Sequence, residues 1–152
     1  MFLVRHAIAG SRSRWKGDDN LRPLNGRGRQ QAQALADLLA DRGVTKVVSS
    51  PATRCVQTVE PLAEALGLTV RIDKRLAEGA SLDDALDVLR GEASLVLCAH
   101  GDVIPEIMAT FTKRGMRAIA PQRCQKGSTW EIELRDGRPV EATYHPPATR
   151  GD

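Results

Sequence analysis

Two histidines and two arginines of this sequence are expected to meet at one edge of a folded sheet. Arg5 and His6 directly follow a short apolar run, and His100 follows a second, nearly all-apolar run, so both runs predict buried strands. Arg54 falls in the first turn of an expected helix, whereas the third histidine, His145, falls in the C-terminal tail. In an open parallel sheet, ligands bind beyond the carboxyl ends of the strands, where helix N-termini converge. The pattern therefore predicts a site at that edge.

The residue types at this edge suit a phosphoryl group. Imidazole is a competent nucleophile toward phosphorus, and guanidinium groups can hold the equatorial oxygens of a group in transfer. The first turn of a helix adds N–H groups and a dipole that favour an anion. A single histidine at a strand end is more often a structural hydrogen bonder, so the combination carries the prediction. A metal site is the competing use of two histidines, but adjacent arginines would repel a cation. We expect neither a metal nor another cofactor.

The elements that must position these residues follow from the hydrophobic pattern. Expected strands cover residues 1–4, 46–49, 68–72 and 94–98, expected helices begin near residues 25, 50, 82 and 102, and an expected hairpin covers residues 129–144. Continuous apolar strands that alternate with helices are typical of a parallel sheet covered on both faces. The predicted fold is an α/β, three-layer α/β/α sandwich with a mostly parallel central sheet. The length predicts one domain over residues 1–152.

Local signals refine these boundaries. Asn25 is an expected N-cap, and the helix after it is expected to stop at Gly43. Pro51 suits the first turn of the second helix, whereas Pro61 inside the same pattern predicts a kink or a split. The Pro-rich tail, residues 145–152, is expected to fray.

Composition excludes several classes of protein. Hydrophobic residues make up 41% and charged residues 27% of the chain, an ordinary globular mixture that argues against disorder and fibrous repeats. No apolar run approaches the roughly 18 to 20 residues that span a bilayer, and the first residues lack the apolar core of a signal peptide. The three cysteines are widely spaced and form no CxxC pair, as expected of reduced thiols. These features predict a cytoplasmic protein without a membrane partner.

The net charge of +3 is unevenly distributed. Residues 1–30 contain seven basic and two acidic side chains, a net +5, and the remaining 122 residues carry a net −2. A uniformly basic surface for nucleic acid is therefore not expected. Within this segment, the loop of residues 9–22 could bind further phosphates of a substrate, with Trp15 available to stack on a ring. The candidate substrate-binding residues there are Arg12, Arg14, Lys16 and Arg22. The alternative is a mobile, solvated loop.

Four motifs resemble one known family. They are Leu-Val-Arg-His at 3–6, Pro-Leu-Asn-Gly-Arg-Gly at 23–28 followed by Gln-Ala at 31–32, Ser-Ser-Pro-Ala-Thr-Arg-Cys-Val-Gln-Thr at 49–58, and Ala-His-Gly at 99–101. In this order and combination they resemble the histidine phosphatase superfamily, which includes phosphoglycerate-mutase-like enzymes and small phosphohistidine phosphatases. The remainder, with Lys-Gly-Ser-Thr-Trp at 126–130, resembles the phosphatase half of two-domain Nudix hydrolases. The printed chain contains no Nudix box.

The resemblance implies a role for each matching residue. His6 would be the nucleophile that becomes phosphorylated, Arg5 and Arg54 would hold the phosphoryl oxygens, and His100 would donate a hydrogen bond to the same group. Glu78 stands where family members usually place an acidic proton donor. The alternative for Glu78 is a solvated loop carboxylate.

The sequence departs from the family pattern beside the nucleophile. Ala7 replaces the usual glycine of the RHG motif, a change that the small phosphohistidine phosphatases and Nudix-linked domains tolerate. Ala9 and Arg12 replace the small polar residues that often follow. These changes argue against a phosphoglycerate mutase.

The expected function is a metal-independent phosphatase that forms a phosphohistidine on His6. Its substrate would be a nucleotide or a small phosphorylated metabolite. One alternative is a phosphatase of phosphohistidine on a partner protein. Another, of a different class, is a non-catalytic phosphate-binding or nucleic-acid-binding module. Such a module has no need of both His6 and His100. With an aromatic content of 3%, the chain also has few side chains on which nucleic-acid bases could stack.

Overall fold

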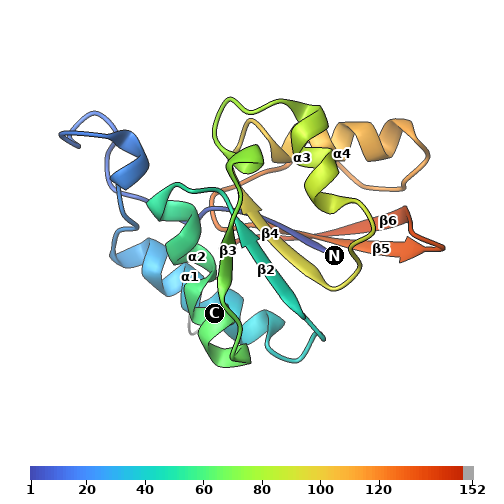
Figure 1. Ribbon diagram of the computed structural model, residues 1–152, viewed down its shortest axis with the longest axis horizontal. Coiled ribbons are helices and arrows are strands. Elements are labelled where there is room, and N and C mark those ends of the chain that lie inside the picture. Colours follow the sequence, from blue (N-terminus) through green and yellow to red (C-terminus); the bar gives the residue numbers. More distant parts are fainter. Residues whose placement is uncertain (149–152) are drawn as a thin grey trace.

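A six-stranded sheet lies between two layers of helices in the computed structural model, which describes residues 1–148 (Figure 1). The elements in chain order are β1 (Phe2–Arg5), the 3-10 helix η1 (Asp19–Leu21), α1 (Gly26–Leu39), β2 (Lys46–Ser49), α2 (Thr53–Leu66), β3 (Val70–Ile72), the 3-10 helix η2 (Lys74–Leu76), α3 (Leu82–Leu89), β4 (Leu95–Ala99), α4 (Ile104–Lys113), β5 (Thr129–Arg135) and β6 (Arg138–His145). The predicted three-layer α/β/α fold is confirmed.

The sheet is parallel on one side and antiparallel on the other. Its strand order is β3-β2-β4-β1-β5-β6. The first four strands of that order are mutually parallel, whereas β5 runs antiparallel to β1 and β6 antiparallel to β5. The predicted terminal hairpin is thus present, joined through Asp136 and Gly137, both with positive φ. It reaches one residue further than expected. His145 is the last residue of β6, where it pairs with Thr129, and does not belong to a tail; its Nε2 lies 2.8 Å from Glu131 Oε2.

The core has one apolar cluster on each face of the sheet. Side chains on a strand alternate between faces, so Leu3 packs with residues of α3 and α4 while Phe2 and Val4 pack with residues of α1 and α2. Figure 1 shows these two pairs of helices on opposite sides of the sheet. Every residue of β4 is buried, as expected for a central strand covered on both faces. Fully burying one such aliphatic side chain contributes about 1.5–3 kcal/mol.

Two helix boundaries differ from the prediction. Asn25 caps α1 as expected, since its side chain accepts a hydrogen bond from the Gly28 N–H. The helix nevertheless ends at Leu39, and the chain makes a further turn before Gly43, whose φ is +71°. The second helix begins at Thr53 with Ala52 as its N-cap, so Pro51 precedes the helix and does not lie in its first turn.

Helix α2 continues through Pro61 without a split. A proline removes one backbone hydrogen bond, which tertiary packing can offset. Pro61 has buried side chains on both sides, Val59 before it and Leu62 and Ala63 after it. These side chains belong to the apolar cluster that also contains residues of α1. The helix is therefore stabilised across its proline by burial of its inner face.

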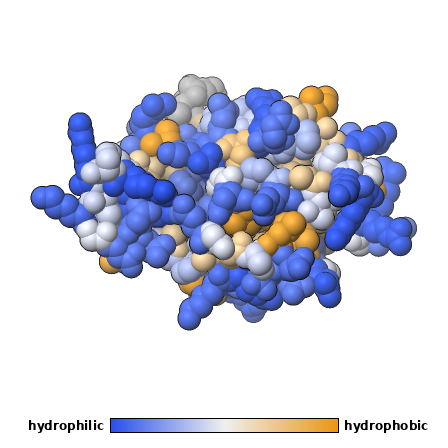
Figure 2. Space-filling model, turned by 90° about the horizontal axis from the view of Figure 1, so that it is seen from above, coloured by the Kyte–Doolittle hydropathy of each residue, from blue (hydrophilic) through white to orange (hydrophobic). Residues whose placement is uncertain are grey.

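The surface is mainly polar. Figure 2 shows a largely hydrophilic covering on the face seen from above in Figure 1, with a small apolar area near its middle. In the part of the chain that the structure describes, no helix is both long and apolar enough to cross a bilayer. Residues 146–148 extend beyond β6 without regular structure, and the remainder of the expected frayed tail, residues 149–152, lies outside the described residues.

Candidate active site

The register of the central strands brings the sequence-predicted residues together. Arg5 pairs with Ala99 across β1 and β4, and Ser49 pairs with Cys98 across β2 and β4. The strands therefore end at nearly the same level, and the residues that follow them share one edge of the sheet. There the His6 N–H donates to the Ala99 carbonyl at 3.0 Å. The rings of His6 and His100 lie edge to face with centroids 5.6 Å apart.

His6 is held as a neutral imidazole. Its side chain is 6% exposed. Its Nδ1 lies 2.8 Å from the Ala7 carbonyl oxygen, and because a carbonyl only accepts, Nδ1 carries the proton. Burial lowers the pKa of His6 to about 3, and the positive charges of Arg54 and Arg5 act in the same direction. In this tautomer Nε2 carries the lone pair that a nucleophile needs.

Two guanidinium groups flank His6, that of the buried Arg54 and that of the half-buried Arg5. Arg54 has a fully buried side chain that donates to Glu78 Oε2 at 2.8 Å and to the Asp19 carbonyl at 2.9 Å. Arg5 donates to the Cys124 carbonyl. Both arginines keep a buried Nε without a hydrogen-bond partner in the described structure. Unsatisfied buried donors are costly and rare, so a pair of them beside one imidazole marks this edge of the sheet as a candidate anion site.

Gly101 permits this placement of Arg5. A Cβ at position 101 would lie 2.7 Å from Cζ of Arg5, closer than real Cβ contacts. The glycine of the Ala-His-Gly motif therefore makes room for the guanidinium group of the Arg-His motif.

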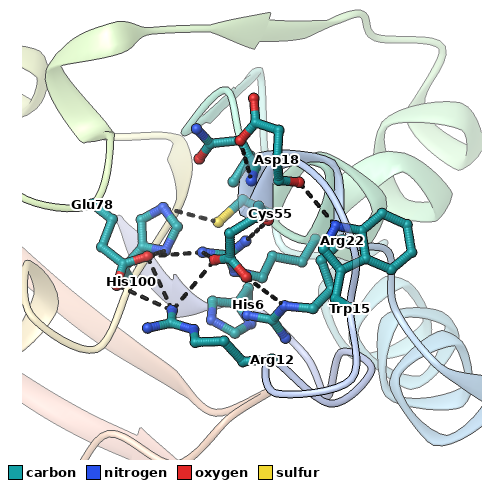
Figure 3. Close-up of polar contacts among 12 residues, drawn as sticks. His6, Arg12, Trp15, Asp18, Arg22, Cys55, Glu78 and His100 are labelled. Atoms are coloured by element: carbon teal, nitrogen blue, oxygen red, sulfur yellow. Dashed lines mark hydrogen bonds and ion pairs between the residues drawn. The ribbon is translucent and has the colours of Figure 1, made fainter.

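His100 and Glu78 complete the group (Figure 3). Nε2 of His100 lies 2.8 Å from Ser50 Oγ and 3.6 Å from Cys55 Sγ, while its Nδ1 lies 4.0 Å from Glu78 Oε2. The Glu78 carboxylate also accepts from Arg12 at 3.2 Å, in addition to its contact with Arg54. Four of the five residues predicted as catalytic from the sequence, Arg5, His6, Glu78 and His100, thus line one cavity. The fifth, Arg54, is buried behind it and is connected to it through the ion pair with Glu78.

The loop after β1 is fixed by side chains of α1 and α2. The Ala7 N–H donates to Thr58 Oγ1 at 2.9 Å, and Thr58 in turn donates to the carbonyl of Arg54 at 2.7 Å. The Ile8 N–H donates to Gln31 Oε1 at 3.0 Å. Gly28 allows α1 to approach this loop, since a Cβ there would lie 1.9 Å from the Ile8 carbonyl oxygen. The motif residues around His6 therefore hold the loop in place.

The cavity at this edge has a volume of about 440 Å³, larger than one phosphoryl group needs, and its walls are polar. Its lining includes Arg5, His6, Arg12, Arg22, Glu78, His100, Asp102 and Lys126. Among residues 1–148, no group of three or more His, Cys, Asp or Glu side chains is arranged to hold a metal ion.

The basic loop divides into two parts. Arg12 lines the cavity, and Arg22 lines it with a buried side chain that donates to Asp19 Oδ1 at 2.9 Å and to the Gly10 carbonyl. Arg14 and Lys16 are exposed and do not line the cavity, contrary to the expectation. The reason is a turn in which the N–H groups of Arg14 and of Trp15 both donate to the Ser11 carbonyl.

Trp15 does not line the cavity either. Its indole N–H donates to the Asp18 carbonyl at 2.9 Å, as Figure 3 shows. The loop therefore contributes Arg12 and Arg22 to the cavity and no aromatic platform.

Comparison with known proteins agrees with this geometry. The model of the histidine phosphatase superfamily (branch 1) matches residues 1–81, just over half of the chain. The chain belongs to the histidine phosphatase superfamily. An 8-oxo-(d)GTP phosphatase of Mycolicibacterium smegmatis (strain ATCC 700084 / mc(2)155) is 38% identical over 154 residues, which cover 97% of this chain and 48% of that protein. The chain thus spans about half the length of this relative.

Solved structures share the fold of this superfamily member. The protein histidine phosphatase SixA complexed with tungstate has a TM-score of 0.70 and 20% identity, with 97% of this chain and 95% of that chain covered. A phosphoserine phosphatase from Entamoeba histolytica in complex with 3-phosphoglyceric acid has a TM-score of 0.72 and 16% identity, with 98% and 96% covered.

Sequence reasoning missed three charged residues of this histidine phosphatase site. Asp19 lies within 3.5 Å of the guanidinium groups of Arg12, Arg22 and Arg54, and these arginines lower its pKa, Arg22 most through its hydrogen bond. Asp102 accepts a hydrogen bond from the N–H of Gly79, the residue after Glu78.

Lys126 reaches the cavity from the loop before β5. The Lys-Gly-Ser-Thr-Trp motif at residues 126–130 is the sequence signal for it, although the motif alone indicates no role. No such signal existed for Asp19 and Asp102, whose positions depend on the folded loops.

Proposed function

We propose that the chain is a phosphatase that transfers a phosphoryl group to Nε2 of His6 and then to water. The observation that carries the proposal is the state of His6. Its Nδ1 proton is engaged by the Ala7 carbonyl, and its imidazole is kept neutral by burial beside the guanidinium groups of the buried Arg54 and the half-buried Arg5, each with an unsatisfied Nε. A neutral nucleophile beside pre-placed donors for an oxyanion is what phosphoryl transfer requires.

The first step would be in-line attack. The Nε2 lone pair forms a bond to phosphorus as the bond from phosphorus to the leaving oxygen breaks. Arg5, Arg54 and His100 hold the other phosphoryl oxygens. Glu78 takes a proton from solvent water as its carboxylate leaves Arg54 and Arg12, and gives this proton to the leaving oxygen. In the second step water attacks phosphorus, the P–N bond breaks and Glu78 takes the proton of the water. The products are the dephosphorylated substrate and inorganic phosphate.

Glu78 must change partners for this sequence. In the free protein its carboxylate occupies Arg54 and Arg12, the cationic contacts that an incoming phosphoryl group would use. Binding of the substrate would transfer these contacts to phosphoryl oxygens and leave the carboxyl group near the leaving oxygen. Its neighbour Gly79 stays fixed to Asp102, so the motion required is a side-chain rotation.

We infer that the substrate is a nucleotide or a small phosphorylated metabolite. The cavity is larger than a phosphoryl group, and the relative that covers 97% of this chain is named for 8-oxo-(d)GTP. Phosphohistidine on a partner protein is the competing substrate. Rates on nucleoside mono-, di- and triphosphates, measured beside a phosphohistidine protein, decide between the two.

The test of the chemistry is to trap the intermediate. After acid-free quenching in alkali, the wild type incubated with a ³²P-labelled substrate should carry an alkali-stable, acid-labile label. His6→Ala should carry no label and lose turnover, whereas the control His145→Ala, at the end of β6, should keep both. Turnover that persists in His6→Ala, or that stops when EDTA is added to the wild type, would contradict the proposal.

A further inference from the structure

Backbone hydrogen bonds fix the turn that contains Lys126 beside His6. The N–H of Gly127 donates to the carbonyls of Arg5 and His6 at 3.2 and 3.0 Å, and Ser128 N–H closes the turn onto the Gln125 carbonyl. Gly127 has a φ of +84°, a conformation that side chains rarely adopt, and a Cβ there would lie 2.9 Å from the side chain of Gln31. This turn places residue 126 at the cavity although it is 120 positions from His6 in the chain.

The ammonium group of Lys126 lacks an acidic partner. In the described part of the chain, no hydrogen bond or ion pair involves its side chain, although the residue lines the cavity. Partial burial lowers its pKa, and so do the charges of Arg5, Arg22 and Arg12. A cation held among other cations without a counter-ion is unfavourable, so an anionic ligand would relieve the repulsion.

The other cations at the rim are already paired. Arg22 pairs with Asp19, and Arg12 pairs with both Asp19 and Glu78. When a phosphoryl group takes the place of Glu78 on Arg54, it occupies the inner end of the cavity between the arginines and the two histidines. Lys126, an exposed residue at the cavity wall, then still has no carboxylate partner among the described residues.

We propose that Lys126 is a specificity-determining residue that binds a second phosphate of the substrate, linked by an anhydride bond to the phosphoryl group that His6 accepts. This assignment rests on the proposed function. The leaving group would then be a phosphate oxygen, and Lys126 would stabilise the negative charge that increases there as the P–O bond breaks. A monoester whose organic group carries no phosphate offers no second anion for Lys126 to bind.

The test compares two substrates in two variants of Lys126 and one control variant. Lys126→Gln keeps most of the length and removes the charge, Lys126→Arg keeps the charge, and Lys113→Gln removes an exposed charge at the end of α4. The readout is kcat/KM for a nucleoside 5′-diphosphate divided by kcat/KM for p-nitrophenyl phosphate. Lys126→Gln should lower this ratio about 10- to 100-fold, the range for loss of a hydrogen bond to a charged group. Lys126→Arg should largely restore it.

Other outcomes separate this inference from the proposed function. An unchanged ratio in Lys126→Gln, or an equal loss on both substrates, would overturn the role of Lys126 while leaving the phosphatase proposal intact. If the wild type hydrolysed neither substrate, the proposed phosphatase function would be overturned, but the role of Lys126 in binding a second phosphate would not. In that case calorimetry with inorganic pyrophosphate and orthophosphate still tests Lys126. Tighter binding of pyrophosphate that Lys126→Gln abolishes would support its role, and equal binding of the two anions would overturn it.

Discussion

Replacing His6 should remove a pH dependence of stability that the buried imidazole imposes on the fold. In the unfolded chain a histidine has a pKa of 6.5, whereas burial lowers that of His6 to about 3 in the folded protein. Between these values the unfolded chain binds a proton that the folded protein excludes. The free energy of unfolding therefore falls as the pH decreases from 6.5 toward 3, by about 1.4 kcal/mol for each pH unit well inside this window.

The magnitude follows from these two values. Between pH 7.5 and pH 5.0 the contribution of His6 should fall by about 2 kcal/mol. Urea unfolding of the wild type and of His6→Gln at both pH values measures it, because the remaining groups titrate in both proteins and cancel in the difference. The wild type should lose about 2 kcal/mol more than the variant. His6→Asn should behave like His6→Gln, since neither side chain titrates.

The protonation state of His6 can also be measured directly. Titration of the His6 imidazole by NMR should show a neutral ring with its proton on Nδ1 at pH 5. Equal losses of stability in wild type and variants, or a ring that gains a proton near pH 6.5, would refute the reasoning. The neutral nucleophile of the proposed mechanism would then lose its structural basis.

Three further substitutions test the framework of the site. Arg54→Lys should lower kcat/KM by at least about 100-fold in steady-state assays, because an ammonium cannot reproduce the fork of a guanidinium group; near-normal activity would contradict its role. Thr58→Val should lower the free energy of unfolding by about 1–3 kcal/mol, since it leaves the buried Ala7 N–H unpaired, and unchanged urea unfolding would count against that contact. Gly28→Ala should be destabilising by more than about 2 kcal/mol because its Cβ collides with backbone, whereas Gly26→Ala, with open space around it, should be neutral or stabilising by up to about 1 kcal/mol. Equal stability of these two variants would argue against close packing of α1.

The inner part of the site could be predicted because local pattern and sheet geometry determine it. His6 and His100 each follow an apolar strand, and parallel strands deliver their carboxyl ends to one edge. Arg54 follows from its place in the first turn of α2. Each of these positions depends on a single element and its neighbour in the sheet.

The outer part could not be predicted in the same way. Lys126 arrives through a loop whose course depends on the antiparallel addition of β5 beside β1. Arg14 and Lys16 have the right charge, but a local turn directs them to solvent. Pro61 predicted a kink or a split because the low helix propensity of proline is a property of that residue alone. The apolar side chains buried on both sides of it stabilise the whole of α2, which continues through the proline.

The two outer strands of the sheet bear on how the protein behaves at high concentration. Unpaired strand edges are templates on which copies of a chain aggregate. Here β3 is only three residues long, and β6 carries Pro139, which cannot donate to a further strand, opposite an irregularity in β5 between Glu133 and Leu134. Short length, proline and a bulge are the features that block such templates. The same sheet that gathers the candidate catalytic groups at one end thus carries, on both flanks, features that disfavour edge-to-edge pairing of copies.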